Sequence, residues 1–528
     1  MGFISRSRTY RITLQPIGKV VRAKEGARLR DVLFEYGGEF PCGGQGQCRG
    51  CRIRVHQGRT TLNPAQKERL SRREIEDGWR LACQCAVESD LVIELRQWDA
   101  AILSNDTVFA FTPQEGLGVA VDLGTTTLVA QLLDLQNGHV LAVRTALNPQ
   151  ARYGGDVMSR IQFAVGEGGQ RCLEEVARRQ IGSLIRQLLS AAHMEDRQLR
   201  RVVIVGNTVM HYLFCGLDAE PLSRYPFEPE QAGLQTFTSR DLGWQIEGDP
   251  RVQFLPCLGS FVGSDLLAGM LATGLHERER LTALVDLGTN GEIVMGSRER
   301  ILCASTAAGP AFEGARIAMG MRAATGAIWK VQAQDGALVC QTLGNAEPRG
   351  VCGSGLVDAV AAGLDLGAIL SGGRLAHGKK ALMLSPPVAI SQADIRQLQL
   401  AKGAIAAGMR ILLRTWGATP EDVETVYLAG AFGNYVDHAS ARRIGLVDFP
   451  PEKVQPAGNT ALLGAKLALF ALDGEDRSYP AIRARVEHVS LHADPAFQDI
   501  YTEAMGFPAG PLPEPDNMKE GFCSCQRR

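Results

Sequence analysis

Five cysteines within one stretch are the first residues of this sequence whose types and spacing could do chemistry. The segment Cys42-Gly-Gly-Gln-Gly-Gln-Cys48-Arg-Gly-Cys51 has the spacing C-x5-C-x2-C, and Cys83 and Cys85 follow downstream. The glycines let a loop wrap a rigid group at short radius and let backbone N–H groups point at the sulfur atoms. Four thiolates suffice to hold a [2Fe–2S] cluster. The spacing therefore predicts such a cluster on three cysteines of the loop and one of the later pair.

The choice between Cys83 and Cys85 stays open at this point. Both lie in the apolar segment 80–87, and in a strand of period two they would share one face. A structural zinc site is the alternative for the whole set. Zinc sites usually pair C-x2–4-C units, whereas Cys83 and Cys85 are separated by one residue. The spacing favours an iron–sulfur site over zinc.

A second kind of chemistry is indicated by two copies of the sequence Asp-Leu-Gly-Thr. Asp122-Leu-Gly-Thr-Thr-Thr127 and Asp286-Leu-Gly-Thr-Asn-Gly-Glu292 each lie between two apolar runs. Such a turn aims backbone N–H groups and Thr hydroxyls at a phosphate, and the Asp at the strand end can hold the water shell of a metal ion. We therefore expect Asp122 and Asp286 to position Mg²⁺. The expected phosphate contacts are Gly124, Thr125, Thr126, Gly288, Thr289 and Asn290.

A third loop follows the apolar strand at 426–429. Its small residues would let a backbone approach a purine and a ribose, and the candidate contacts are Gly430, Ala431, Gly433 and Asn434. Gly353 and Ser354 open a helical segment at 356–361 and form either a further nucleotide-facing turn or a plain helix N-terminus. The sequence holds no Gly-x-x-x-x-Gly-Lys-Ser/Thr motif, which excludes a P-loop enzyme.

The elements that must position these residues fall into separate regions. A hairpin at 9–22, a short helix at 29–36 and strands at 51–56 and 91–95 predict a small β-grasp-like domain. After residue 118 apolar strands alternate with helical segments, and the strand–loop–strand unit occurs twice, which predicts a duplicated α/β domain with a cleft between its halves. The expected boundaries are a domain at 1–98, a linker at 99–117, two halves at 118–279 and 280–508, and a tail at 509–528.

One helix is predicted with particular clarity. Residues 391–416 carry apolar side chains at helical spacing, and Ser391 with Asp394 forms a capping-box pattern at the start.

Composition limits the classes of protein that the chain can be. It has 528 residues, enough for several domains, with 45% hydrophobic and 21% charged residues. A formal net charge of −1 gives no reason to expect nucleic acid or an anionic membrane as partner. No apolar run is long enough to span a bilayer, and no secretory signal is recognisable. Of the 13 cysteines, the tail pair Cys523 and Cys525 is expected to be incidental.

Two resemblances sharpen this reading. The cysteine loop is similar to that of adrenodoxin-like ferredoxins, and Arg80-Leu-Ala-Cys83-Gln resembles the segment that carries their fourth ligand, which implies Cys83. The three loops resemble those of the actin-like ATPases, in which the first two bind phosphates and metal and the third binds adenosine. The resemblance implies an α+β β-grasp ferredoxin domain followed by an α/β duplicated, ribonuclease H-like ATPase domain.

The combination resembles one family, the ATP-dependent reductive activators of corrinoid proteins. The resemblance rests on the loops above and on these further stretches: Val205-Gly-Asn-Thr-Val-Met210, Ala308-Gly-Pro-Ala-Phe-Glu-Gly-Ala315 and Gln399-Leu-Ala-Lys-Gly-Ala-Ile405. It implies that a [2Fe–2S] cluster, ATP and Mg²⁺ serve to reduce inactive Co(II) to Co(I) in a methyltransferase system. It further implies a corrinoid protein as partner, an external low-potential electron donor, a homodimer and a cytoplasmic location.

Two other functions remain open from the residues alone. One is an ATP-dependent activator of a different radical or metalloenzyme, such as a dehydratase, for which Cys352 would be the candidate ligand of a bridging cluster. The other is a small-molecule kinase with a fused iron–sulfur domain.

Overall fold

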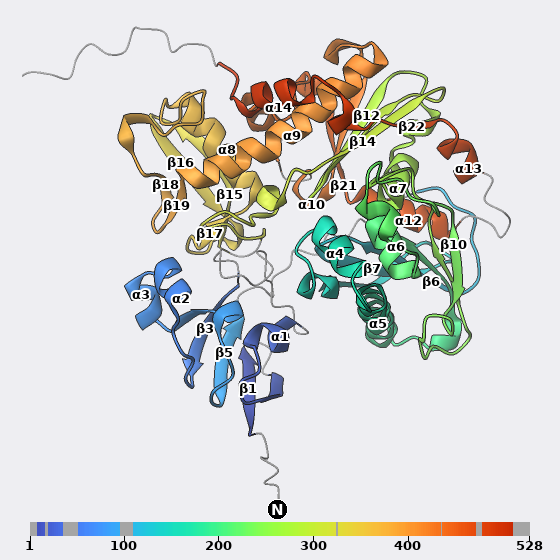
Figure 1. Cartoon of the computed structure of the whole chain (residues 1–528), viewed down its shortest axis with the longest axis horizontal. Helices are drawn as coiled ribbons and strands as arrows, with labels where there is room; N and C mark the ends of the chain where they lie inside the picture. Colours follow the sequence, from blue (N-terminus) through green and yellow to red (C-terminus); the bar gives the residue numbers. More distant parts are fainter. Residues whose placement is uncertain are drawn as a thin grey trace, which may run out of the picture.

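The computed structural model describes residues 8–15, 19–34, 51–95, 109–323, 326–433, 436–470 and 478–509. Of the residues singled out above, Cys42, Cys48, Asn434, Cys523 and Cys525 lie outside these ranges, as does the side chain of Ala431. The described chain forms one small N-terminal domain and two larger α/β halves (Figure 1).

The N-terminal domain is built on a five-stranded sheet in the order β2-β1-β5-β3-β4. Its strands are β1 (Thr9–Gln15), β2 (Lys19–Lys24), β3 (Arg52–Gln57), β4 (Trp79–Leu81) and β5 (Leu91–Leu95). β1 pairs antiparallel with β2 and parallel with β5, and α1 (Leu29–Phe34) packs on the sheet through Leu29 and Leu33. Two short helices, α2 (Pro64–Arg69) and α3 (Arg72–Glu76), lie between β3 and β4. The β-grasp prediction is confirmed.

The two halves repeat one sheet topology. The first sheet has the order β10-β11-β9-β6-β7-β8 and the second β21-β20-β12-β13-β14-β22. The first comprises β6 (Leu117–Leu123), β7 (Thr127–Asp134), β8 (Val140–Leu147), β9 (Leu199–Val205), β10 (Gln235–Thr238) and β11 (Arg251–Phe254). The second comprises β12 (Thr282–Leu287), β13 (Gly291–Gly296), β14 (Ile301–Thr306), β20 (Thr425–Ala429), β21 (Val454–Gly458) and β22 (Val486–His488). In both, three antiparallel strands are followed by strands that pair in parallel, which confirms the duplicated fold.

Helices cover both faces of each sheet and join the halves. α4 (Val157–Ala164), α5 (Gly169–Ala191) and α6 (Thr208–Cys215) pack on the first half, and α8 (Gly353–Asp365), α9 (Gln392–Trp416) and α14 (Phe497–Met505) on the second (Figure 1). α7 (Ser264–Thr273) and α12 (Thr460–Leu469) pack on one another between the two sheets. One hydrophobic cluster therefore contains residues of both halves, for example Val205 and Leu284.

The second half also carries two small sheets above the N-terminal domain. They consist of β15 (Ala327–Gln334), β16 (Ala337–Thr342), β17 (Gly350–Val351), β18 (Ala381–Ser385) and β19 (Val388–Ser391). α9 begins directly after β19. The Ser391 hydroxyl accepts from the Asp394 backbone N–H at 3.2 Å, while the Asp394 carboxylate accepts from the Ser391 backbone N–H at 2.7 Å. The predicted capping box and helix are confirmed.

Hydrogen bonds connect the N-terminal domain to the halves above it. Arg52 Nη2 donates to the Arg349 carbonyl and Arg152 Nη2 to the Asp31 carbonyl, each over 3.2 Å. The N-terminal domain thus contacts the second half next to Cys51 and the first half through α1 (Figure 1).

Part of the expected linker is packed on the larger domain. Phe109 and Phe111 contact the ring of Phe470 at the end of α12, with ring centroids 5.4 and 4.5 Å away. Residues 109–116 therefore belong structurally to the two halves.

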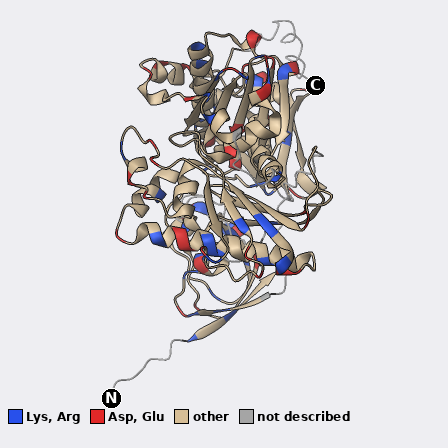
Figure 2. Ribbon diagram, turned by 90° about the vertical axis from the view of Figure 1, so that its right-hand side faces the viewer, with Lys and Arg blue, Asp and Glu red and all other residues tan. Residues whose placement is uncertain are grey.

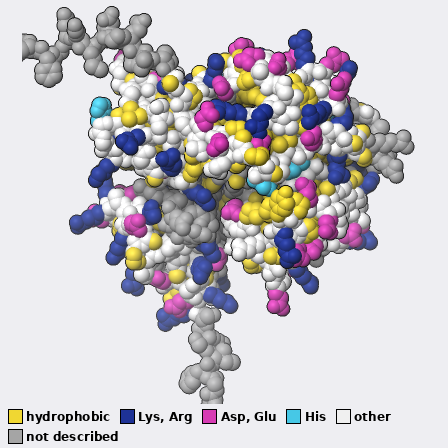
Figure 3. All heavy atoms as spheres, turned by 45° about the horizontal axis from the view of Figure 1, so that its top comes forward, with side chains coloured by type: hydrophobic (Ala, Val, Ile, Leu, Met, Phe, Trp, Pro, Cys, Tyr) yellow, Lys and Arg dark blue, Asp and Glu magenta, His cyan; other side chains and the backbone are white. Residues whose placement is uncertain are grey.

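The surface is mixed in character. Basic and acidic residues are interspersed along the ribbon in Figure 2, and Figure 3 shows hydrophobic side chains in separate patches, one of them next to histidines. An aromatic cluster of Tyr225, Phe227 and His492 joins a loop of the first half to the segment after β22. Within the described ranges, no helix has the length and apolar character needed to cross a membrane.

Candidate functional site

Two of the predicted cluster ligands lie side by side in the N-terminal domain. Cys51 precedes β3, and Cys83 lies in η1 (Ala82–Gln84), a 3-10 turn after β4. The pairing of β3 with β4 brings the Sγ atoms of Cys51 and Cys83 to 3.3 Å from one another. Two adjacent thiols are the donor set that an iron of a [2Fe–2S] cluster takes. The other two predicted ligands, Cys42 and Cys48, are outside the described residues.

Cys85 has different surroundings from Cys83, and the expectation of a shared strand face is wrong. The 3-10 turn at 82–84 interrupts the period of two, so Cys85 points into the hydrophobic core of the domain. Its thiol donates to the Leu81 carbonyl over 3.3 Å, and burial raises its pKa to about 12. A thiol that resists ionisation is a poor metal ligand, since the thiolate is the binding form.

The nucleotide loops converge between the two halves. Asp122 is the penultimate residue of β6 and Asp286 that of β12, at the strand ends where the repeated motif predicts them. The third loop forms the short helix α10 (Gly430–Gly433) directly after β20. Gly430 has a φ of +85°, and a Cβ there would lie 2.7 Å from Asp286 Oδ1, so only glycine lets this loop approach the carboxylate.

A chain of side chains joins the first two loops across the cleft. The hydroxyl oxygens of Thr126 and Thr289 are 3.2 Å apart. The Thr289 hydroxyl donates to Glu313 Oε1 over 2.7 Å. Glu313 belongs to η6 (Pro310–Glu313), in the stretch 308–315 that also carries the family resemblance. This stretch lies against the second loop, since the Gly309 backbone N–H donates to the Thr289 carbonyl over 2.9 Å.

Asn290 follows Thr289 in the second loop, and its carbonyl accepts from the Gly288 backbone N–H over 3.2 Å. Thr125, in contrast, is buried, and its hydroxyl accepts from Asn207 Nδ2 over 2.8 Å. Gly124 is held from behind by Asn148, whose Nδ2 donates to the Gly124 carbonyl over 2.9 Å. The first loop is thus fixed by two asparagines that carry no charge.

Four carboxylates gather at this cleft. Burial raises the pKa of Asp122 to about 6, although Asn459 donates to it, and burial together with the charge of Asp122 raises that of Asp286 to about 7. Burial raises the pKa values of Asp265, on the first turn of α7, and of Glu292, on β13. The neighbouring carboxylates raise both pKa values further. The sequence analysis did not identify Asp265 or Glu292 as site residues. Asp265 lies on a helix that has no motif in common with the loops, whereas Glu292 belongs to the second Asp-Leu-Gly-Thr segment and could have been identified from it.

This acidic cleft fits a magnesium nucleotide. Mutually repelling carboxylates are stabilised by a divalent cation, and Mg²⁺ commonly keeps several waters between itself and the protein. Among the residues that the structure describes, no three His, Cys, Asp or Glu side chains are close enough together to hold a metal ion directly. Binding through water, as predicted for the aspartates at the strand ends, suits this spacing.

The residues at the start of α8 lie inside the fold. A Cβ on Gly353 would lie 1.8 Å from the Phe312 carbonyl, and the Ser354 hydroxyl donates to the Trp329 carbonyl over 2.9 Å. Phe312 stacks on Phe432 of the third loop at 4.6 Å between ring centroids. Gly353 and Ser354 therefore lie directly behind this loop, and direct contact with a nucleotide stays a prediction.

Cys352, the candidate ligand for a cluster in the ATPase domain, is buried. Its thiol donates to the Ile328 carbonyl over 3.4 Å, and burial raises its pKa. These surroundings suit a small core residue and not a ligand of a cluster shared between subunits.

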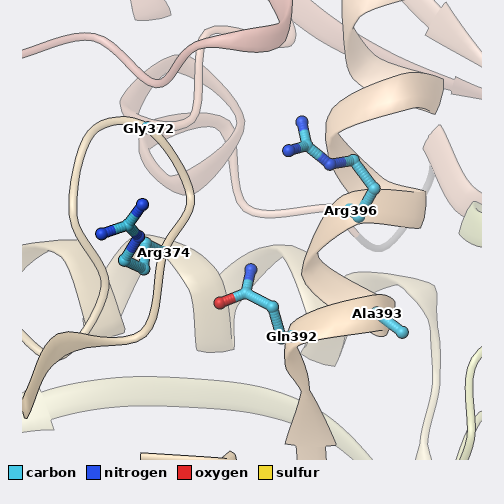
Figure 4. A pocket seen from close by; sticks show the side chains of 5 residues that line it. All are labelled: Gly372, Arg374, Gln392, Ala393 and Arg396. Carbon is cyan, nitrogen blue, oxygen red and sulfur yellow. The ribbon is translucent and has the colours of Figure 1, made fainter. Parts of the chain in front are cut away.

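An open hollow of about 610 Å³ lies apart from the three loops. It is lined by Gly372 and Arg374 of the loop after α8 and by Gln392, Ala393 and Arg396 at the start of α9 (Figure 4). Both arginines are exposed. The hollow contains none of the four carboxylates, so we locate the nucleotide chemistry at the cleft.

Comparison with known protein families accounts for nearly all of the chain. Residues 12–88 match the 2Fe-2S iron-sulfur cluster binding domain. Residues 117–278 match the RACo middle region, and residues 280–516 match the C-terminal domain of RACo, described as the ASKHA domain.

Individual relatives extend over most of the chain. The sequence is 34% identical over 435 residues to the corrinoid activation enzyme RamQ of Eubacterium limosum, covering 76% of this chain and 72% of the relative. It is 30% identical over 418 residues to the [Co(II) methylated amine-specific corrinoid protein] reductase of Methanosarcina barkeri, covering 73% and 76%. A solved structure, the reductive activator for corrinoid,iron-sulfur protein, superposes with a TM-score of 0.69 at 27% identity, over 94% of this chain and 98% of that one.

Proposed function

Because this chain belongs to the family of reductive activators of corrinoid proteins, we propose that it uses ATP to reduce the inactive Co(II) form of a corrinoid protein to Co(I). One relative is named a corrinoid activation enzyme, and another a reductase of a Co(II) methylated amine-specific corrinoid protein. The electron comes from the [2Fe–2S] cluster of the N-terminal domain, and the corrinoid protein belongs to a methyltransferase system.

One observation carries the proposal: a pair of adjacent thiols and a cluster of buried carboxylates beside the nucleotide loops occur in one chain, in domains that touch. Cys51 and Cys83 lie 3.3 Å apart in the first domain, and Arg52, next to Cys51, donates to Arg349 of the second half. A protein that only stored electrons would not need the cleft. A kinase would not need the thiols.

The cluster ligands we propose are Cys42, Cys48, Cys51 and Cys83. When bound, the cluster supplies one-electron transfer. The rest of the domain supports this ligand set in two ways. Cys85 keeps its proton in the core and so does not compete as a ligand. Arg52 stabilises the strand that follows Cys51 through an ion pair with Glu74 at 3.2 Å.

For the nucleotide we propose that Asp122 and Asp286 hold the water shell of Mg²⁺. The phosphates are bound by Gly124, Thr125 and Thr126 of the first loop and by Gly288, Thr289 and Asn290 of the second. The adenosine is bound by Gly430, Ala431, Gly433 and Asn434, with Gly353 and Ser354 supporting them. The geometry that favours this assignment is the approach of all three loops to the two aspartates.

ATP supplies the free energy that makes the reduction feasible. For a one-electron step, each ~59 mV of unfavourable potential difference costs about 1.4 kcal/mol. A nucleotide that favours one conformation of the complex over another can offset several such increments. The bond between Thr126 and Thr289 crosses the cleft, so phosphates that enter between these hydroxyls must change how the halves are joined.

We further propose an external low-potential donor that reduces the cluster, a homodimeric assembly and a cytoplasmic location. These follow from the family resemblance, and each is accessible to a simple measurement: sedimentation for the dimer and cell fractionation for the location.

The proposed function is tested by mixing the reconstituted protein with a Co(II) corrinoid protein captured from the same cells, a reduced donor and MgATP. The expected result is the visible absorption of Co(I), formed faster and in higher yield with ATP than without. If ATP instead yields a phosphorylated metabolite and leaves the cobalt unchanged, the chain is a kinase.

A further inference from the structure

Arg160 is a charged side chain that is entirely buried behind the first phosphate loop. It lies on α4 and is 0% exposed. Its Nη2 donates to the Thr125 carbonyl over 2.6 Å and its Nε to the Gly154 carbonyl over 3.0 Å. Its Nη1 approaches Gln150 Oε1 at 3.4 Å. The guanidinium is therefore hydrogen-bonded directly to the backbone of the first phosphate loop.

Arg160 Nη1 also approaches Met210 Sδ at 3.6 Å, so all four of its acceptors are neutral, and none of the ion pairs among the described residues involves it. Burial lowers its pKa to about 9, and Asp156 is the carboxylate that acts in the opposite sense. Asp156 itself caps α4 by accepting from the Ser159 backbone N–H. Arg160 therefore remains a cation at neutral pH, and burying a cation without a paired carboxylate is costly unless another negative charge compensates for it.

The other supports of this loop show that a charge is not needed to hold its shape. Asn148 and Asn207 fix Gly124 and Thr125 through amide hydrogen bonds. One further arginine, Arg322, reaches the loop from the second half and donates to the Thr127 hydroxyl over 2.9 Å. Around these residues the cleft is lined by four carboxylates, which repel a phosphate unless cations oppose them.

We propose that Arg160 is a positioning residue for the nucleotide phosphates: it fixes the Thr125 peptide from behind, and its buried positive charge is balanced by the phosphates when they bind. This inference rests on the proposed function only in assuming that the cleft binds ATP. It predicts that the loss of binding affinity on removing the charge of Arg160 grows with the number of phosphates on the ligand. A role confined to packing predicts no such dependence.

The test is a calorimetric titration of the purified protein with MgATP, MgADP and adenosine. Arg160→Met is expected to weaken ATP binding about 10- to 100-fold, as for a unit charge acting over about 6 to 12 Å at an effective dielectric constant of about 20. ADP should lose less, and adenosine should bind within about twofold of the wild type. Arg160→Lys keeps the charge. Its ratio of ATP affinity to adenosine affinity should therefore stay close to the wild-type ratio.

Arg178→Met is the matched control in the same half. Arg178 also donates to a backbone carbonyl, that of Phe214, but it pairs with Glu174. Its loss is expected to leave all three affinities unchanged. Should Arg160→Met fail to fold, Arg160→Gln provides a second neutral variant with a polar end.

An equal loss of affinity for ATP, ADP and adenosine in the neutral variant, or no loss for any of them, would overturn the inference. The inference would also be overturned if Arg160→Lys lost as much of its preference for ATP over adenosine as the neutral variant does. If the wild-type protein itself fails to bind ATP, the proposed function is at fault, and not the role of Arg160.

Discussion

Cys83 and Cys85 are close in sequence but differ in chemistry. Cys83 lies 3.3 Å from Cys51, whereas Cys85 is buried in the core with its pKa raised to about 12. We therefore expect Cys83→Ala to abolish the visible absorption and the paramagnetic signal of the reduced cluster. Cys85→Ala should retain both, and iron analysis after reconstitution measures the difference.

Cys85→Ala serves as the matched control, because it removes the same thiol from the same segment. Loss of iron from the Cys85 variant together with retention in the Cys83 variant would show that the ligand set is wrong.

The carboxylates of the cleft predict how stability depends on pH. In the folded chain the pKa values of Asp122 and Asp286 are raised from 3.8 to about 6 and about 7. Between pH 4 and pH 7 the unfolded chain therefore releases protons that the folded chain keeps. Each pKa unit corresponds to about 1.4 kcal/mol, so the free energy of unfolding contributed by these groups falls as the pH rises through 6 and 7.

Urea unfolding of the magnesium-free protein at about pH 5.5 and about pH 8 measures this effect. The midpoint should be lower at the higher pH, Asp286→Asn should reduce the difference, and MgATP should restore stability at the higher pH. A midpoint that rises with pH in the absence of Mg²⁺ would contradict the burial of these carboxylates.

Sequence patterns located the residues that repeat a motif and missed those that only the fold assembles. Asp122 and Asp286 stand at the ends of apolar strands and carry a local signal. Asp265 and Arg160 come from helices that share no spacing with the loops, and Glu313 comes from a 3-10 turn, so only the folded chain brings these side chains to the site.

At the scale of elements, α9 shows how local chemistry fixes a helix. Its capping box was legible because the two reciprocal hydrogen bonds join residues three positions apart. Ser391→Ala should lower the free energy of unfolding by about 1 kcal/mol, whereas Ser391→Thr, which can still cap, should lower it less. Denaturant titration followed by circular dichroism measures both, and equal effects would contradict a capping role.

The turn at Ala82–Gln84 shows the opposite case. Its sequence, between β4 and the core residue Val87, is apolar enough for a strand, and period two was the natural expectation. The chain forms a 3-10 turn instead, and the buried Gln66 side chain donates to the Gln84 carbonyl of this turn over 3.4 Å. The Gln66 side chain accepts from the Leu81 backbone N–H and donates to the Thr61 carbonyl. Such a contact between distant segments has no local signature.

At the scale of the molecule, the order of the domains was predictable and their contacts were not. The repeated loops indicated two halves, and five strands of each sheet follow the same order, with β10 and β22 as additional strands at opposite edges. The hydrogen bonds by which Arg52 and Arg152 connect the first domain to both halves could not be predicted from the sequence. Each arginine donates to a backbone carbonyl, which any residue could provide.

The measurement that tests the central claim most directly is the Co(I) to Co(II) ratio of a cognate corrinoid protein, recorded against ambient potential with and without MgATP. ATP is expected to raise this ratio at potentials where reduction is otherwise unfavourable, by a factor of ten for each ~59 mV supplied. Asp286→Asn, with its cluster intact, should lose the ATP-dependent increase. The same ratio with and without ATP at every potential would contradict the account.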